Sequence, residues 1–328
     1  MAPSDLCAVG VDLGGTKVEI AIVDHGGRLQ QRLKHPTDVE AGPDAILAGI
    51  TGAVRGLIAE TGSTPIGVGV GLAGQIDSKQ GLVRFAPNLG WRDLPFQRDL
   101  TRALQLPVIV TNDVRAATWG EWLHGAGKGC DDLVCLFVGT GIGGGIVSAG
   151  RVLSGCSNTA AELGHMTVDL NGPPCTCGNR GCLEALAGGW ALARQAREAV
   201  ATDPTAGGLL LQMAGGKPEA LTAKLVADAA KAGDPLAERL IDEATRALTA
   251  GSVSLVHAFN PCRLILGGGV MEGLPHLVDV IDRGVRLRAL PASTEPLQVL
   301  PAKLGGDAGV IGAATLAIET FKDTEHPP

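Results

Sequence analysis

The segment from Glu162 to Glu184 constrains this chain most, because it gathers one histidine and three cysteines in a short, glycine-rich stretch. These potential metal ligands are His165, Cys175, Cys177 and Cys182. Three thiolates and an imidazole complete the tetrahedron of a structural Zn²⁺ site, with no position left open for water. Such a metal would also fix where the flanking carboxylates of Glu162 and Glu184 point. We expect a zinc loop that grips a polar ligand; a zinc knuckle with no further role is the alternative.

Composition narrows the class of protein. A chain of 328 residues with 45% hydrophobic content can bury a large core and favours about two domains. The formal charge of -7 indicates no broad cationic surface, so we expect small-molecule partners, no nucleic acid and no membrane. The start of the chain lacks a secretory signal, and no apolar run reaches the ~18 residues that span a bilayer. We therefore expect a cytoplasmic protein.

A pattern of strand, glycine turn and strand occurs twice. It is predicted first over 8–13 and 18–23, around Gly14, Gly15 and Thr16. It returns over 133–138 and 146–148, around a cluster that runs from Gly139 through Thr140 and Gly141 to Gly145. Two such matches suggest an internal duplication, and they place a ligand cleft where the two halves meet.

The remaining patterns alternate between helix and strand, which indicates a mixed α/β architecture. Helices are predicted over 44–60, 94–106, 114–124, 183–201, 219–230, 235–258 and 308–320. Strands are predicted over 66–72, 108–111 and 263–266, and a surface loop over 202–217.

The glycine turns are candidates for phosphate binding. Consecutive backbone N–H groups in such a turn form a concavity for phosphate oxygens, to which Thr16 and Thr140 could add hydroxyl donors. Asp12, beside the first turn, could hold Mg²⁺ directly or through water. Each turn alone is equally compatible with a tight hairpin. Neither fits the phosphate loop of NTPases or the dinucleotide fingerprint, which argues against a dehydrogenase.

Asn112 and Asp113 stand where a predicted strand ends and a helix begins. Both residue types are preferred helix N-caps, worth about 1 kcal/mol, so the pair has a purely structural interpretation. The carboxyl ends of strands are also where open α/β sheets bind ligands. In that case Asp113 could accept a proton from an attacking hydroxyl while Asn112 hydrogen-bonds a neighbouring one.

Together these motifs resemble the ROK family of sugar kinases and repressors, from about Val9 to Ile318. The resemblance is carried by residues 12–16, the 112–113 pair, and residues 139–145, 162–165 and 175–184. It is closest to the bacterial ATP-dependent glucokinases, with N-acetylhexosamine kinases next. It implies an actin-like ATPase (hexokinase/ribonuclease H-like) fold with two domains around a central cleft. The smaller domain would span 1–115 and be joined by the C-terminal helix 308–328, and the larger would span 116–307 with the zinc loop.

The resemblance also implies a role for each candidate residue. Asp113 matches the catalytic base. Positions that hydrogen-bond the sugar are matched by Asn88, Asn112, Glu162, His165 and Glu184. The zinc ligands would be His165, Cys175, Cys177 and Cys182. Phosphate-binding turns are matched by Gly14, Gly15, Thr16, Thr140 and Gly141, and the turn that faces the adenosine by Gly267, Gly268 and Gly269. The implied cofactors are ATP, Mg²⁺ and structural Zn²⁺, and the implied assembly is a homodimer or homotetramer.

The preferred hexose stays open. We expect transfer of the γ-phosphoryl group to the C6 hydroxyl of glucose, with N-acetylmannosamine or N-acetylglucosamine as alternatives. Where many relatives have proline in the loop before the sugar site, this chain has Ala73, which loosens that loop and leaves the sugar preference open. A non-catalytic sugar sensor or repressor is the alternative from another class. We expect no repressor, because the first strand begins at about Ala8 and leaves no room for an N-terminal DNA-binding domain.

Overall fold

The computed structural model describes residues 6–77, 80–203 and 205–323, which form two compact units. The first unit holds residues up to 129 together with 152–160 and the C-terminal residues from 306. The second holds residues 130–151 and 161–305. No helix among the described residues is both long and apolar enough to cross a membrane.

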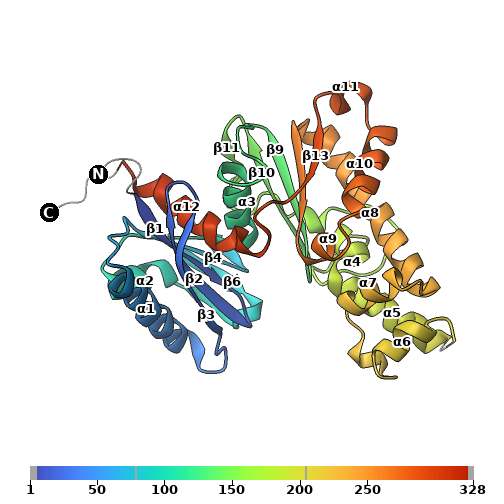
Figure 1. Ribbon diagram of the computed structural model, residues 1–328, viewed down its shortest axis with the longest axis horizontal. Helices are drawn as coiled ribbons and strands as arrows, with labels where there is room; N and C mark the ends of the chain where they lie inside the picture. The colour runs from blue at the N-terminus through green and yellow to red at the C-terminus, as the bar shows by residue number, and fades with distance from the viewer. Residues whose placement is uncertain (1–5, 78–79, 204, 324–328) are drawn as a thin grey trace. The chain divides into compact units, whose positions relative to one another are not determined.

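The first unit is built on a five-stranded sheet with the order β3-β2-β1-β4-β8. Figure 1 labels β1, β2, β3 and β4 of this sheet. Its strands are β1 (Cys7–Leu13), β2 (Lys17–Asp24), β3 (Leu29–Pro36), β4 (Val68–Leu72) and β8 (Val108–Asn112). The helices of the unit are α1 (Gly42–Thr61), α2 (Phe96–Leu104), α3 (Asp113–Leu123) and α12 (Ala308–Phe321). A small sheet of β5 (Gln75–Asp77), β6 (Leu82–Ala86) and β7 (Trp91–Leu94), with a 3₁₀ turn at Pro87–Leu89, completes it.

The two faces of β1 have different partners, as the two-residue period of a strand requires. Val9 and Val11 belong to the apolar core that also takes in side chains of α1 and α2. Gly10 faces α12 instead, and a Cβ at this position would collide with the carbonyl of Val310. Asp12 lies on that same face, so its carboxylate is directed toward the start of α12.

The second unit repeats this strand order as β11-β10-β9-β12-β13. These strands are β9 (Leu133–Val138), β10 (Ile142–Ser148), β11 (Arg151–Val152), β12 (Arg263–Gly267) and β13 (Gln298–Pro301). The helices are α4 (Leu183–Ala187), α5 (Gly189–Thr202), α6 (Gly208–Met213), α7 (Ala223–Lys231), α8 (Pro235–Phe259), α9 (Gly269–Gly273), α10 (Leu277–Arg288) and α11 (Pro291–Thr294). In both sheets an antiparallel hairpin is followed by parallel strands, the pattern that the two glycine turns suggested.

The units divide the chain differently from the predicted boundary at residues 115 and 116, which falls inside α3. The cause is the packing of α3 on α12. Gly312 lies so close to α3 that a Cβ there would collide with the carbonyl oxygen of Ala116. The whole of α3 therefore stays with the first unit, as does α12. Residues 324–328 of the predicted C-terminal segment lie outside the described residues.

Several elements differ from the sequence-based prediction. The glycines at 143–145 lie inside β10 and not in the turn, which is limited to residues 139–141. The predicted helix over 183–201 is two helices that meet at Gly188. The predicted loop over 202–217 contains the short helix α6.

Candidate active site

Three strand ends of the first unit lie at one edge of its sheet. Strands β1, β4 and β8 are parallel, and Leu13 pairs with Leu72, which pairs with Asn112. The residues that follow these positions therefore come together at the carboxyl edge, where α/β sheets bind ligands. The Asn112 side chain ties two of the ends together, since its Nδ2 donates to the Gly74 carbonyl at 3.3 Å.

Asn112 and Asp113 have separate roles. Asn112 is the N-cap of α3, and its Oδ1 accepts hydrogen bonds from the backbone N–H groups of Val114 and Arg115 at 3.0 and 3.2 Å. Asp113 is the first residue of the helix, and burial raises the pKa of its carboxyl group. The capping interpretation thus holds for Asn112, whereas Asp113 is left with a carboxylate whose basicity is increased by its surroundings.

A second carboxylate, Asp12, lies near Asp113. Burial raises the pKa of Asp12 to about 6, and the negative charges of Asp113 and Glu19 add to the effect. Glu19 is the cross-strand partner of Asp12 and pairs with the Lys34 ammonium at 2.8 Å. A Cβ on Gly309, in the first turn of α12, would lie 2.8 Å from Asp12 Oδ2, so helix and carboxylate are in close contact. Two neighbouring carboxylates form a suitable oxygen donor set for Mg²⁺.

The first glycine turn lies against the predicted sugar contact Asn88. The Gly14 N–H donates to the Lys17 carbonyl at 3.0 Å and closes the turn. A Cβ on Gly15 would approach the Asn88 carbonyl oxygen to 2.7 Å, so only glycine permits this proximity. The structure thus brings the turn, Asn88, Asp12, Asn112 and Asp113 together in the first unit.

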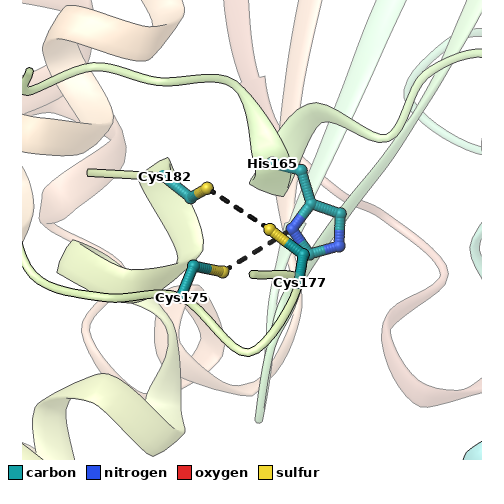
Figure 2. A group of neighbouring side chains, drawn as sticks. All are labelled: His165, Cys175, Cys177 and Cys182. Carbon is teal, nitrogen blue, oxygen red and sulfur yellow. Dashed lines mark hydrogen bonds between the residues drawn. The ribbon is translucent and has the colours of Figure 1, made fainter. Parts of the chain in front are cut away.

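The four predicted zinc ligands converge in the second unit. The ligand atoms of His165, Cys175, Cys177 and Cys182 all lie within 4.8 Å of one another (Figure 2). The His165 Nδ1 is 3.8 Å from the Cys175 Sγ, and the Cys177 and Cys182 sulfur atoms are 3.7 Å apart. Tetrahedral zinc with bonds near 2.3 Å separates its ligand atoms by about 3.7 to 3.8 Å. The residues therefore fit a structural zinc ion in donor type and in spacing.

Two further features of the cluster bear on metal binding: the pKa of Cys182 and the orientation of the His165 ring. Burial and the neighbouring Cys177 and Cys175 thiols raise the pKa of Cys182 to about 12, a crowding that a bound dication would relieve. The Nδ1 of His165 faces the sulfur atoms, while Nε2 points away from them (Figure 2). One imidazole can thus serve the metal through Nδ1 and offer Nε2 to a ligand.

The short 3₁₀ helix Leu163–His165 places Glu162 and His165. It packs tightly on β10, because a Cβ on Gly164 would collide with the Ile142 carbonyl and one on Gly144 would collide with the Leu163 side chain. This close approach explains why glycines continue beyond the turn into β10. Glu162, the residue before the 3₁₀ helix, is exposed and has its carboxylate available to a ligand.

Glu184 is bound into the second glycine turn. Its Oε2 accepts the backbone N–H of Ile142 at 2.8 Å and lies where a side chain on Gly141 would be. Its Oε1 accepts the indole N–H of Trp190 at 3.1 Å. Nothing in the spacing of the tryptophans predicts this hydrogen bond to a carboxylate six positions earlier.

A cavity of about 920 Å³ opens beside this turn. Gly139 and Thr140 of the turn line it together with Gly269 at the start of α9. These segments meet because β9 and β12 are parallel neighbours whose carboxyl ends share one edge. Gly268 has φ +87° and lies close to the Val138 carbonyl. It sets the backbone path just before Gly269 but does not line the cavity. Trp190, Arg197, Lys224 and Lys231 also line it, and the volume suits a nucleotide.

Comparison with known proteins agrees with this geometry. Residues 8–320 match the ROK family model. A glucokinase of Streptomyces coelicolor is 36% identical, with 95% of this chain and 97% of that protein covered. An N-acetylmannosamine kinase of Citrobacter koseri is 32% identical, with 95% of this chain and 99% of the relative covered.

Among solved structures, a ROK family glucokinase from Streptomyces griseus in complex with glucose and AMPPNP superimposes with a TM-score of 0.82. It is 38% identical, and the match covers 95% of this chain and 99% of that one. The predicted actin-like ATPase fold is thereby confirmed. With a family model that matches nearly the whole chain and relatives above 30% identity, this chain belongs to the ROK family.

Proposed function

We propose that the protein is an ATP-dependent hexose kinase that transfers the γ-phosphoryl group to the C6 hydroxyl of glucose. The observation that carries the proposal is the Asp113 carboxylate, which lies half-buried at the carboxyl edge of the sheet near Asp12 and has a raised pKa. The family supports the same activity, because the glucokinases similar to this chain are covered over nearly their full length.

In this proposal Asp113 acts as the general base. Phosphoryl transfer depends mainly on in-line placement of the acceptor and on neutralisation of charge. Asp113 orients the C6 hydroxyl and accepts its proton as the oxygen attacks phosphorus. A raised pKa makes this carboxylate a better proton acceptor than an ordinary aspartate.

The sugar would be held by Asn88, Asn112, Glu162, His165 and Glu184. Asn112 has its Oδ1 committed to the α3 cap and donates one Nδ2 hydrogen to the Gly74 carbonyl, so it would serve the sugar through its other Nδ2 hydrogen. His165 would use Nε2, since Nδ1 faces the thiols. The ligands His165, Cys175, Cys177 and Cys182 would hold a structural Zn²⁺ that keeps this loop in place.

The nucleotide would occupy the 920 Å³ cavity, with Gly267, Gly268 and Gly269 forming the turn beside the adenosine. Backbone N–H groups of the two glycine turns, with Thr16 and Thr140, would bind phosphate oxygens. Asp12 would hold Mg²⁺ directly or through water, and that ion supplies charge neutralisation on the phosphates when bound.

A panel of sugars assayed with ATP and Mg²⁺ tests the proposal. The panel contains glucose, N-acetylmannosamine, N-acetylglucosamine and fructose, and ADP release is coupled to NADH oxidation. We expect the highest kcat/KM with glucose. A preference for N-acetylmannosamine would favour the second candidate, which the 32% identity to the Citrobacter koseri kinase supports. A protein that binds a sugar without turning over ATP would instead be a sensor.

A further inference from the structure

Trp190 contacts both the candidate nucleotide cavity and the candidate sugar ligand Glu184 in the second unit. Trp190 is one of the residues that line the candidate nucleotide cavity, and its indole N–H donates to Glu184 Oε1 at 3.1 Å. Its backbone N–H donates to the Thr140 carbonyl at 2.8 Å, within the second glycine turn. We propose that Trp190 is a positioning residue. When a nucleotide occupies the cavity, Trp190 fixes the orientation of the Glu184 carboxylate and thereby strengthens sugar binding. The inference rests on the proposed kinase function.

The orientation of Glu184 can respond to a ligand in the cavity, because its two carboxylate oxygens accept hydrogen bonds from different donors. Oε2 is held by the Ile142 N–H at the end of the glycine turn, at 2.8 Å, and Oε1 is held by the indole. Both partners belong to segments that border the cavity. The orientation of the carboxylate is therefore set by groups that a nucleotide would contact, although Glu184 itself does not line the cavity.

The indole also contacts the guanidinium of Arg194. The guanidinium of Arg194 lies 5.3 Å from the Trp190 ring centroid, and its Nη2 donates to the Ala185 carbonyl at 3.3 Å. Ala185 is the neighbour of Glu184 in α4. Arg194, Trp190 and Glu184 thus form a closed set of contacts between α5 and α4. A ligand that packs against the indole would stiffen this set and reduce the freedom of the Glu184 carboxylate.

Coupling between two ligands is reciprocal, which gives a direct test. The dissociation constant of glucose is measured by calorimetry with and without a non-hydrolysable ATP analogue, and that of the analogue with and without glucose. We expect both constants to fall by the same factor, at least about fivefold. Absence of coupling in the unmodified protein would overturn the inference, whatever any variant does.

Trp190→Phe removes the indole N–H but keeps an aromatic ring against the cavity. We expect glucose affinity to fall about fivefold to tenfold and the coupling factor to drop below about two, with analogue affinity nearly unchanged. Trp119→Phe, the same substitution in the first unit, is the matched control and should leave both constants unaltered. A coupling factor in Trp190→Phe equal to that of the unmodified protein would refute the proposed role.

A double-mutant cycle shows whether Trp190 acts through Glu184. In a Glu184→Ala background, Trp190→Phe should change glucose affinity less than about twofold, since the acceptor of the indole N–H is gone. Equal losses in both backgrounds would assign Trp190 a general structural role and overturn the inference. Failure of the proposed function gives a different result from failure of the coupling. An unmodified protein that neither binds nor phosphorylates glucose would remove the premise. An active protein whose double-mutant cycle shows no interaction between Trp190 and Glu184 would remove only the coupling.

Discussion

At the residue scale, the account depends on two carboxylates at one sheet edge. Asp113 begins α3 and Asp12 is the next-to-last residue of β1. Burial raises the pKa of both carboxyl groups, and the charges of Asp113 and Glu19 add to the rise at Asp12. Buried, neighbouring carboxylates destabilise a folded protein, and such arrangements are typical of functional sites. The neutral residue Asn112 supplies the helix cap, which leaves Asp113 free for chemistry.

Asp113→Asn is expected to abolish turnover while leaving glucose binding largely intact. The amide keeps the size of the side chain but cannot accept the hydroxyl proton. We expect kcat to fall at least about 10³-fold, with a glucose dissociation constant within about threefold of the original. Steady-state kinetics and calorimetry measure the two quantities. Near-normal turnover in this variant would exclude Asp113 as the base.

Asp12→Asn should stabilise the fold at neutral pH even as it lowers activity. The folded-state pKa of about 6 exceeds the ordinary value of 3.8, so the folded state binds more protons between those values. The contribution of Asp12 to stability therefore decreases as pH rises from about 4 to 6. In Mg²⁺-free buffer at pH 7, we expect Asp12→Asn to raise the free energy of unfolding by about 1 to 2 kcal/mol.

Urea titrations at pH 7 and pH 4 check this prediction. The gain should shrink at pH 4, where the folded-state carboxyl group is already protonated. Asp242→Asn, at an exposed position of α8, is the control and should change stability by less than about 0.5 kcal/mol. A gain from Asp12→Asn that is the same at both pH values would contradict the ionisation argument.

At the element scale, glycines and cysteines fix how segments meet. The 3₁₀ helix Leu163–His165, which carries one member of the histidine and cysteine cluster, is held against β10 by Gly144 and Gly164, which permit close contact. The apolar cores are extensive in both units, so these special contacts determine the position of the site more than the stability of the whole.

Cys175→Ala is expected to lower zinc content and weaken sugar binding. Removal of one ligand opens the coordination sphere, so the loop loses metal-linked folding free energy and His165 and Glu184 lose their fixed positions. We expect glucose KM to rise about tenfold. Atomic absorption reports the metal and steady-state kinetics the KM. Cys156→Ala, at an exposed position outside the cluster, is the control. Full metal content with an unchanged KM would contradict the role of the loop.

Gly312→Ala should destabilise the first unit, because the added methyl group would collide with the backbone of α3 at Ala116. We expect a loss of about 2 to 3 kcal/mol in the free energy of unfolding. Gly52→Ala, in α1 with open space around it, should instead add about 0.5 to 1 kcal/mol. Thermal and urea unfolding of the two variants measure the contrast. Equal effects would show that contact with α3 is not the reason for glycine at 312.

These glycines also mark the limit of prediction from sequence. The hairpins on either side of each glycine turn, the long helix α8 and the convergence of His165 with three cysteines were predictable, because apolar periodicity and ligand spacing are local signals. The break at Gly188 was not, since it arises from contact with the distant turn residues Gly139 and Thr140. The hydrogen bond from Trp190 to Glu184 likewise depends on how that break turns α5 relative to α4.

At the scale of the whole molecule, two units with the same strand order each provide part of the chemistry. The first holds the two carboxylates, Asn88 and one glycine turn, and the second holds the cluster of His165 with three cysteines, the other turn and the 920 Å³ cavity, to which the proposed function assigns zinc and nucleotide. The match to the ROK family model covers residues 8–320 and therefore includes the residues of both units named above. An ATP-dependent sugar kinase requires all of these parts, whereas a sensor would require only the sugar-binding ones.

The most direct test of the central claim is ³¹P NMR of the products formed from glucose, ATP and Mg²⁺. The account predicts that ADP and a single new phosphomonoester, glucose 6-phosphate, appear in equal amounts, and that 6-deoxyglucose yields no sugar phosphate. Release of ADP and inorganic phosphate without any sugar phosphate, or phosphorylation at a hydroxyl other than C6, would contradict it.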